Sequence, residues 1–168
     1  DYQLWKIFTQ ELLFQIKKNL IFRPHPLDDW NLAKRYSIDF GEKYITNKKN
    51  FKEDLNRSKI IINTSLQTTF YQSMKTGIPT IILFNRKTLN INPKLLKLQN
   101  SFLENKIFFK NPHEASKHIN EIWDNPLEWW NSKKILELRN LFSEYCSIEK
   151  EDNLSYWKKL LKNQINGQ

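Results

Sequence analysis

The chain has 168 residues, a length typical of a single domain, and 39% of them are hydrophobic. This is enough apolar surface for a core, which excludes a wholly disordered chain, while 3 glycines and one cysteine exclude collagen-like and disulfide-stapled folds. The net charge of +9 is the excess of 27 basic over 18 acidic residues, and the basic residues are spread along the chain. Proteins that bind nucleic acid usually cluster such residues, so we expect no nucleic-acid partner. A basic surface still favours a polyanionic partner, which includes a phosphate-bearing donor and peripheral contact with an anionic membrane face.

The first third of the chain is predicted to be helical apart from one short strand. In chain order we expect a helix over 2–18, a strand over 20–22, a short helix through Tyr36 capped by Asp28 or Asp29, a loop over 41–50, and helical turns over 51–57. The apolar residues at helical spacing that form the buried face of the first helix are Trp5, Phe8, Leu12 and Ile16. Pro24 and Pro26 end the strand, because proline fixes its backbone and donates no hydrogen bond.

The centre of the chain has the pattern of a βαβ unit. A β-branched run over 59–63 is typical of a strand buried on both faces, and a helix follows that ends at Lys75 and is closed by Gly77. The apolar run 79–84 predicts the next buried strand. We therefore expect an α/β fold with a Rossmann-like parallel sheet flanked by helices.

The rest of the chain is predicted to be mainly helical. We expect a helix over 93–105, a strand over 107–109, a helix over 112–123, and a helical C-terminal extension of the same domain over 126–168. The buried faces predicted in this extension are Ile135, Leu138, Phe142 and Tyr145, and then Leu154, Trp157, Leu161 and Ile165. His113 and His118 are five residues apart and share no helix face at metal-ligand spacing, so we expect both at the surface.

The first candidate site is the segment that follows the strand over 20–22. In Arg23-Pro24-His25-Pro26, the prolines hold the histidine in a rigid loop, from which its ring can donate a hydrogen bond to phosphate. Arg23 can add a bidentate contact. The alternative is a turn that only ends the strand, with His25 packed or facing water.

The second candidate site lies between the central strand and its helix. Thr64, Ser65, Thr68 and Thr69 bring hydroxyl groups to the N-terminus of the helix, where free N–H groups favour a phosphate. The glycines of a Walker loop or a dinucleotide fingerprint are absent. The alternative is that these residues only cap the helix, which accounts for Ser65 better than for the whole run.

Together these segments resemble a known architecture. The order of an HP loop followed by SKIIINTSLQTTFYQSMKTGIPTIILF resembles the C-terminal, donor-binding lobe of GT-B glycosyltransferases. It is most similar to transferases from surface-carbohydrate and nonulosonic-acid gene clusters, which share a stretch like NPLEWWNSKKILELRNLF. It also resembles HP-motif sialyltransferases, capsule 3-deoxy-manno-octulosonate transferases and, more distantly, CDP-glycerol glycerophosphotransferases.

The resemblance implies roles for individual residues. The histidine of the HP motif, here His25 followed by Pro26, contacts the phosphate of the donor and helps the nucleotide leave. The hydroxyls of Ser65, Thr68 and Thr69 are implied to bind the same phosphate. Gln72 stands near the place of a glutamate that holds ribose in many GT-B lobes, which makes it a weaker candidate.

The resemblance also sets the expected function and its limits. We expect the nucleotide-binding half of a GT-B glycosyltransferase that moves a sugar, CMP-linked and acidic, onto a bacterial surface polysaccharide or glycolipid such as lipopolysaccharide. We expect no metal and no cofactor besides this donor, and a location in the cytoplasm or at the inner face of the membrane. The chain begins at Asp1, so we expect residues 1–168 to be one domain of a longer protein. The acceptor base would lie in the absent N-terminal lobe, which leaves this part inactive by itself. The alternative is a nucleotide- or phosphate-binding α/β domain without catalysis.

Overall fold

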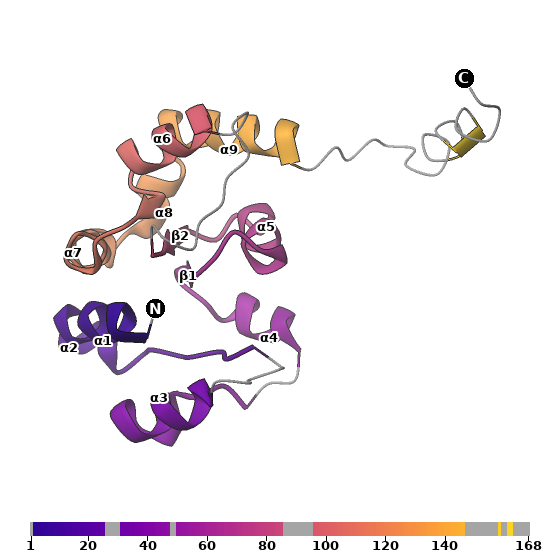
Figure 1. Cartoon of the computed structure of the whole chain (residues 1–168). Coiled ribbons are helices and arrows are strands. Elements are labelled where there is room, and N and C mark those ends of the chain that lie inside the picture. Colours follow the sequence, from indigo (N-terminus) through magenta and orange to yellow (C-terminus); the bar gives the residue numbers. More distant parts are fainter. Residues whose placement is uncertain are drawn as a thin grey trace.

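The structure, a computed structural model, describes residues 2–25, 31–47, 50–85 and 96–146, together with 158, 161 and 162. These residues form an α/β fold in which helices cover a three-stranded parallel sheet (Figure 1). The helices are α1 (Tyr2–Glu11), α2 (Phe14–Lys17), α3 (Leu32–Phe40), the 3-10 helix η1 (Glu42–Tyr44), α4 (Phe51–Asn56), α5 (Thr68–Lys75), α6 (Leu96–Glu104), α7 (Pro112–Ile122), α8 (Pro126–Trp130) and α9 (Lys133–Cys146). The strands are β1 (Ile61–Asn63), β2 (Thr80–Leu83) and β3 (Phe108–Phe109). The predicted fold class is confirmed.

The sheet has the order β1-β2-β3, and both strand pairs are parallel. Ile61 lies opposite Thr80 and Ile82 lies opposite Phe108. The predicted βαβ unit is therefore present as β1-α5-β2. Gly77 closes the unit after α5 with φ at +75°, a backbone conformation that residues with a Cβ rarely adopt.

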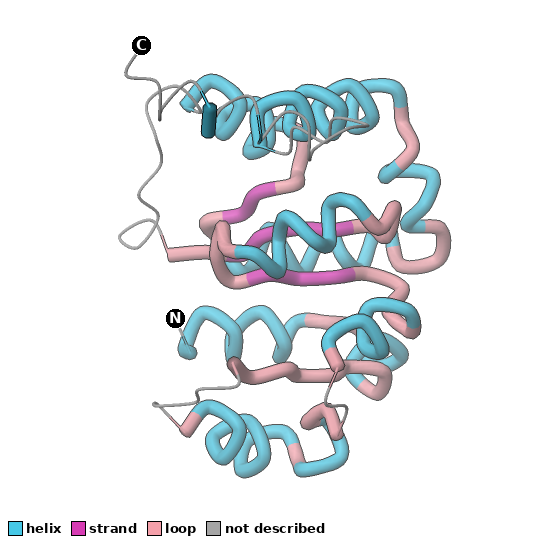
Figure 2. The backbone as a smooth tube through the Cα atoms, turned by 90° about the vertical axis from the view of Figure 1, so that its right-hand side faces the viewer, coloured by secondary structure: helices cyan, strands magenta, loops and turns pink. Residues whose placement is uncertain are grey.

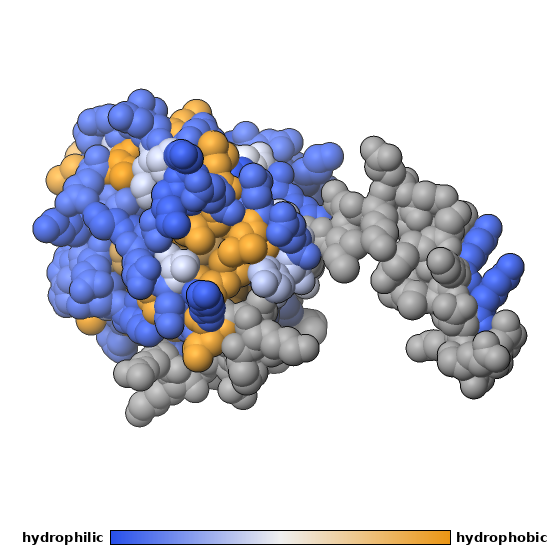
Figure 3. Space-filling view, turned by 90° about the horizontal axis from the view of Figure 1, so that it is seen from above, coloured by the Kyte–Doolittle hydropathy of each residue, from blue (hydrophilic) through white to orange (hydrophobic). Residues whose placement is uncertain are grey.

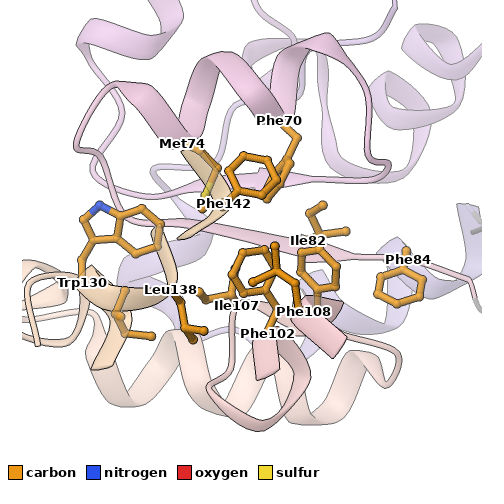
Figure 4. Close-up of a cluster of buried hydrophobic side chains, with 12 residues drawn as sticks. Phe70, Met74, Ile82, Phe84, Phe102, Ile107, Phe108, Trp130, Leu138 and Phe142 are labelled. Atoms are coloured by element: carbon orange, nitrogen blue, oxygen red, sulfur yellow. The ribbon is translucent and has the colours of Figure 1, made fainter. Parts of the chain in front are cut away.

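The sheet has an apolar cluster on each face, because alternate residues of β2 point in opposite directions. Ile82 and Phe84 pack into the cluster drawn in Figure 4, with Phe70 from α5 and Phe142 from α9. Ile81 and Leu83 pack into the other cluster, which holds all four predicted core residues of the first helix. Burying each large apolar side chain contributes roughly 1.5–3 kcal/mol, so β2 is the best-stabilised strand.

The strand predicted over 20–22 is reduced to one parallel bridge between Phe22 and Ile45. The Phe22 N–H donates to the Tyr44 carbonyl at 2.7 Å, and the Thr46 N–H donates to the Phe22 carbonyl at 2.9 Å. The ladder does not extend further because Pro24 has no N–H to donate. The predicted loop over 41–50 correspondingly holds η1 and the other half of this bridge.

The single helix predicted over 2–18 is wrong, because the backbone breaks between α1 and α2. The side chain of Asn120, from α7, occupies the break: its Nδ2 donates to the Glu11 carbonyl and its Oδ1 accepts from the Leu13 N–H, both at 3.0 Å. This amide satisfies two backbone groups that the break leaves without helical partners. The predicted buried face is still confirmed, since Trp5, Phe8, Leu12 and Ile16 are all buried.

Other helix boundaries follow the predictions with local differences. Helix α3 continues past Tyr36 to Phe40, and its N-cap is Asn31, while Asp28 and Asp29 lie outside the described residues. In α9, Ile135, Leu138 and Phe142 are buried as predicted, but Tyr145 is 62% exposed. Leu161 is exposed too, and the predicted partners Leu154, Trp157 and Ile165 lie outside the described residues.

His118 is a second correction, because it lies in the interior rather than at the surface. It is 3% exposed, with its ring 5.5 Å from that of Phe109 and 4.8 Å from that of Trp129. Neither ring nitrogen has a hydrogen-bond partner among the described residues. Burial lowers the pKa of His118 to about 4, helped by the nearby charge of Lys106, so the ring is neutral at pH 7.

The surface over α6 and α9 is mixed in character. Seen from above, apolar side chains lie among hydrophilic ones (Figure 3). Leu96 on α6 and Leu141 on α9 are among the exposed apolar residues.

Within the described ranges, no helix is long and apolar enough to cross a membrane.

Candidate functional site

The first candidate segment ends with an exposed histidine. His25 follows the Phe22 bridge by three residues and is exposed, as the predicted role in ligand binding requires. Of the alternative, the ring packed into the interior is therefore wrong, while a turn with His25 facing water agrees with its exposure equally well. Pro26 lies outside the described residues, so its predicted part in the site stays a prediction.

Arg23, the other charged residue of this segment, lies against a carboxylate. Its Nη1 donates to Oδ2 of Asp54 at 2.5 Å, and its guanidinium lies 5.7 Å from the centre of the Phe51 ring. The side chain is only 24% exposed. Sequence reasoning assigned Arg23 to phosphate and missed Asp54, which lies 31 residues further along the chain on α4.

The second candidate segment leads from β1 into α5. Thr64, Thr68 and Thr69 are exposed and Ser65 is half-buried, so the hydroxyl-bearing run lies at the surface where β1 ends. Gln72, the weaker candidate, is exposed one turn later.

The N-terminus of α5 is not capped by the side chain of its N-cap residue. Gln67 is the N-cap residue, with extended backbone angles, and its side chain makes no capping hydrogen bond. The Phe70 N–H, in this first turn, donates to the Gln67 carbonyl at 2.9 Å, so the N–H groups of Thr68 and Thr69 are the ones with no acceptor within the helix. Ser65 precedes the N-cap by two residues, so the alternative of Ser65 as the N-cap of α5 is wrong. The first turn of α5 therefore offers backbone donors beside the hydroxyl groups of Thr68 and Thr69.

Asn63 is a polar residue that sequence reasoning did not select. It is the last residue of β1, only 8% exposed, and its Nδ2 has no hydrogen-bond partner among the described residues. The only sequence signal was an amide at the end of an apolar run, which also fits a simple strand stop. Asn63 adds a buried donor group directly before the Thr64–Thr69 run.

The two candidate segments lie on one side of the molecule. Figure 2 shows that the segment ending at residue 25 and strand β1 both end on the same side, and α5 begins there. In open parallel sheets, ligands bind outside the carboxyl ends of the strands, where helix N-termini converge. The structure thus brings the His25 segment and the α5 N-terminus to the edge of the sheet that is suited to an anionic ligand.

A family model described as LIC12162 family transferase matches residues 2–161. The chain belongs to this family. The match covers both candidate segments, and the family is described as transferases. No curated protein and no solved structure matches the chain.

Proposed function

We propose that this transferase moves a sugar from a nucleotide-activated donor, and that the phosphate of the donor binds between His25 and the N-terminus of α5. The observation that carries the proposal is the N-terminus of α5, whose N-cap side chain makes no capping hydrogen bond and which bears exposed hydroxyl groups at the carboxyl end of β1. Such a terminus attracts anions through its free N–H groups and the helix dipole.

The proposed chemistry follows from the charge that develops as the sugar leaves. Breaking the bond between sugar and phosphate leaves additional negative charge on the nucleotide. Fixed N–H groups, the hydroxyls of Ser65, Thr68 and Thr69, and the ring of His25 would stabilise that charge more in the transition state than in the bound substrate, which lowers the barrier. Gln72 is a candidate for the ribose hydroxyls.

The resemblance to HP-motif transferases supports the finer part of the proposal. On that basis the donor is a CMP-linked acidic sugar, the acceptor is a surface polysaccharide or glycolipid, and a metal ion is not required. The base that activates the acceptor belongs to a separate N-terminal lobe in such enzymes, so we assign no described residue to that role.

The test is nucleotide-induced thermal stabilisation. A ligand that binds only the folded state at ten times its dissociation constant stabilises the protein by about 1.4 kcal/mol. We expect CMP to raise the melting temperature of the wild type. In the His25→Ala variant we expect this rise to be lost while the melting temperature without nucleotide stays nearly unchanged.

The controls are UMP, inorganic phosphate and the variant His113→Ala, which removes another exposed histidine. We expect His113→Ala to keep the full response to CMP. A wild type that melts identically with and without CMP and UMP at millimolar concentrations would contradict the proposal. A large loss of stability in His25→Ala without nucleotide would instead mark His25 as a structural residue.

A further inference from the structure

The two halves of the candidate site are not joined by one continuous hydrogen-bond ladder. Among the described residues, the bridge of Phe22 is to Ile45, and the ladder of β1 is to β2. A cavity of about 470 Å³ has Leu20, Ile21 and Phe22 along one part of its lining and Ile60 and Ile62 along another. Backbone pairing therefore does not fix the distance between the His25 segment and the end of β1.

Side chains centred on Asp54 make the connection that the backbone lacks. Asp54 lies on α4 and is 7% exposed. Its carboxylate accepts from Arg23 at 2.5 Å, from the hydroxyl of Thr46 at 2.9 Å, and from Nη2 and Nε of Arg57 at 2.6 and 3.1 Å. One carboxylate thus holds the strand segment before His25, the segment that pairs with it, and the end of α4.

The other side of this connection leads directly to β1. The hydroxyl of Ser58 donates to the Asp54 carbonyl at 2.7 Å, which closes the turn after α4. From there the chain enters β1 at Ile61, whose N–H donates to the Pro79 carbonyl at 2.8 Å. Asp54 is therefore tied to the β1 half of the site by the chain itself and to the His25 half by Arg23.

The charge that holds this cluster together is present at neutral pH. Burial acts against ionisation of Asp54, but the hydrogen bonds from Arg23, Thr46 and Arg57 outweigh it and lower the pKa of the carboxyl below its ordinary value. Hydrogen bonds between charged partners are stronger than neutral ones, and removing one partner leaves the others without compensation.

We propose that Asp54 is a positioning residue of the transferase, which fixes His25 relative to the N-terminus of α5 by holding Arg23. This inference rests on the proposed function, and it gives Arg23 a role in orienting the segment rather than in binding the donor. Asp54 acts through its neighbours and does not itself touch the ligand.

The first test measures the dissociation constant of CMP by calorimetry for the wild type, Asp54→Asn, His25→Ala and the double variant. We expect Asp54→Asn to weaken binding about tenfold, and to add nothing when His25 is already alanine, because both changes act through one segment. An unchanged affinity for CMP in Asp54→Asn would overturn the positioning role. So would a double variant that binds CMP about tenfold more weakly than His25→Ala alone.

The matched control is Glu11→Gln. The Glu11 carboxylate also joins distant segments, since it accepts from Ser116 at 2.8 Å and pairs with His113, but it ties α1 to α7. We expect this variant to lose stability without changing the affinity for CMP. If Glu11→Gln weakens CMP binding as much as Asp54→Asn does, the effect is one of general destabilisation and the inference fails.

A second test needs no nucleotide. The chain has 3 histidines, so the ring signals of His25 are readily assigned by NMR. We expect Asp54→Asn to shift the His25 signals and to leave those of His113 and His118 in place. Arg23→Gln, which removes the guanidinium contacts with Asp54 and Phe51 and leaves the bonds from Thr46 and Arg57 to Asp54 in place, should do the same if Asp54→Asn does not fold. An unmoved His25 signal overturns the positioning role, whereas a wild type that does not bind CMP contradicts the proposed function alone.

Discussion

Asp54 and His118 are both buried polar residues. They differ in how many hydrogen bonds neighbouring side chains make to them. Asp54 accepts from three side chains and its pKa is lowered, so it stays charged. His118 has no partner among the described residues, and burial lowers its pKa to about 4, so it stays neutral. For an acid the lowered pKa preserves the charge, while for a base it removes the charge.

The buried ring of His118 predicts a pH-dependent loss of stability. Its pKa is about 6.5 in the unfolded chain and about 4 in the fold, so between these values the unfolded state binds more protons. The free energy of unfolding should therefore fall as the pH is lowered from 6.5 towards 4, by about 2 kcal/mol at pH 5 from this residue.

The variant His118→Leu isolates this contribution. It removes two buried nitrogens that make no hydrogen bond within the described ranges, so we expect its stability at pH 7 to equal or exceed that of the wild type by about 1 kcal/mol. Urea unfolding at pH 7 and pH 5 should then show a smaller loss in the variant. Equal losses in both proteins would mean that His118 is protonated in the fold.

At the level of secondary structure, local sequence patterns were sufficient to place most helices and strands. Contacts between distant residues determined where some of these elements begin and end. The runs over β1 and β2 and the glycine after α5 were sufficient to predict the βαβ unit. The break between α1 and α2 was not predictable, because the amide that occupies it comes from Asn120, more than 100 residues away along the chain. The apolar spacing of Trp5, Phe8, Leu12 and Ile16 continues across the break and conceals it.

The break between α1 and α2 predicts a specific role for Asn120. Asn120→Ala leaves the Glu11 carbonyl and the Leu13 N–H without these partners, so we expect a loss of about 1–2 kcal/mol in the free energy of unfolding. The matched control is Asn100→Ala, an exposed position on α6. Denaturant unfolding measures both variants, and equal stability of the two would show that the Asn120 amide contributes nothing to the break.

At the scale of the whole molecule, the strands differ in how they are supported. Strand β2 is paired on both sides and covered by an apolar cluster on each face, whereas Phe22 and Ile45 share a single bridge beside a cavity. Phe22 itself is buried in the apolar cluster, but its segment has only this one bridge among the described residues, and segments with few backbone hydrogen bonds open locally at lower free energy than the core. The His25 segment therefore belongs to the less stable part of the described fold.

Hydrogen exchange measures this difference directly. We expect the amides of Ile82 and Phe84, which donate to carbonyls of the neighbouring chain segment at 2.8 and 3.1 Å, to exchange only on global unfolding. The amides of Phe22 and Thr46 should exchange at least roughly a hundredfold faster through local opening. Similar protection of both pairs would show that the bridge is as stable as the sheet, and that the His25 segment does not depend on side chains for its position.

The candidate site was predictable in part. Hydroxyl residues after an apolar run and a histidine between prolines are local patterns, so Thr64, Ser65, Thr68, Thr69 and His25 could be selected from the sequence. The pairing of Arg23 with Asp54 depends on which segments meet in space, and so does the buried amide of Asn63, whose Nδ2 has no partner in the described part of the chain. No local pattern records either of them.

The sequence by itself determined the fold class and the types of polar residue at the two candidate segments, because hydrophobic spacing and helix-terminal residues act over a few neighbouring positions. Only the tertiary structure decided that the first strand shrinks to one bridge, that Arg23 is bound by a carboxylate, and that His118 is buried. Each of these features depends on groups that are far apart along the chain. The interactions between such groups become strong only when folding brings them together and packing excludes water from between them.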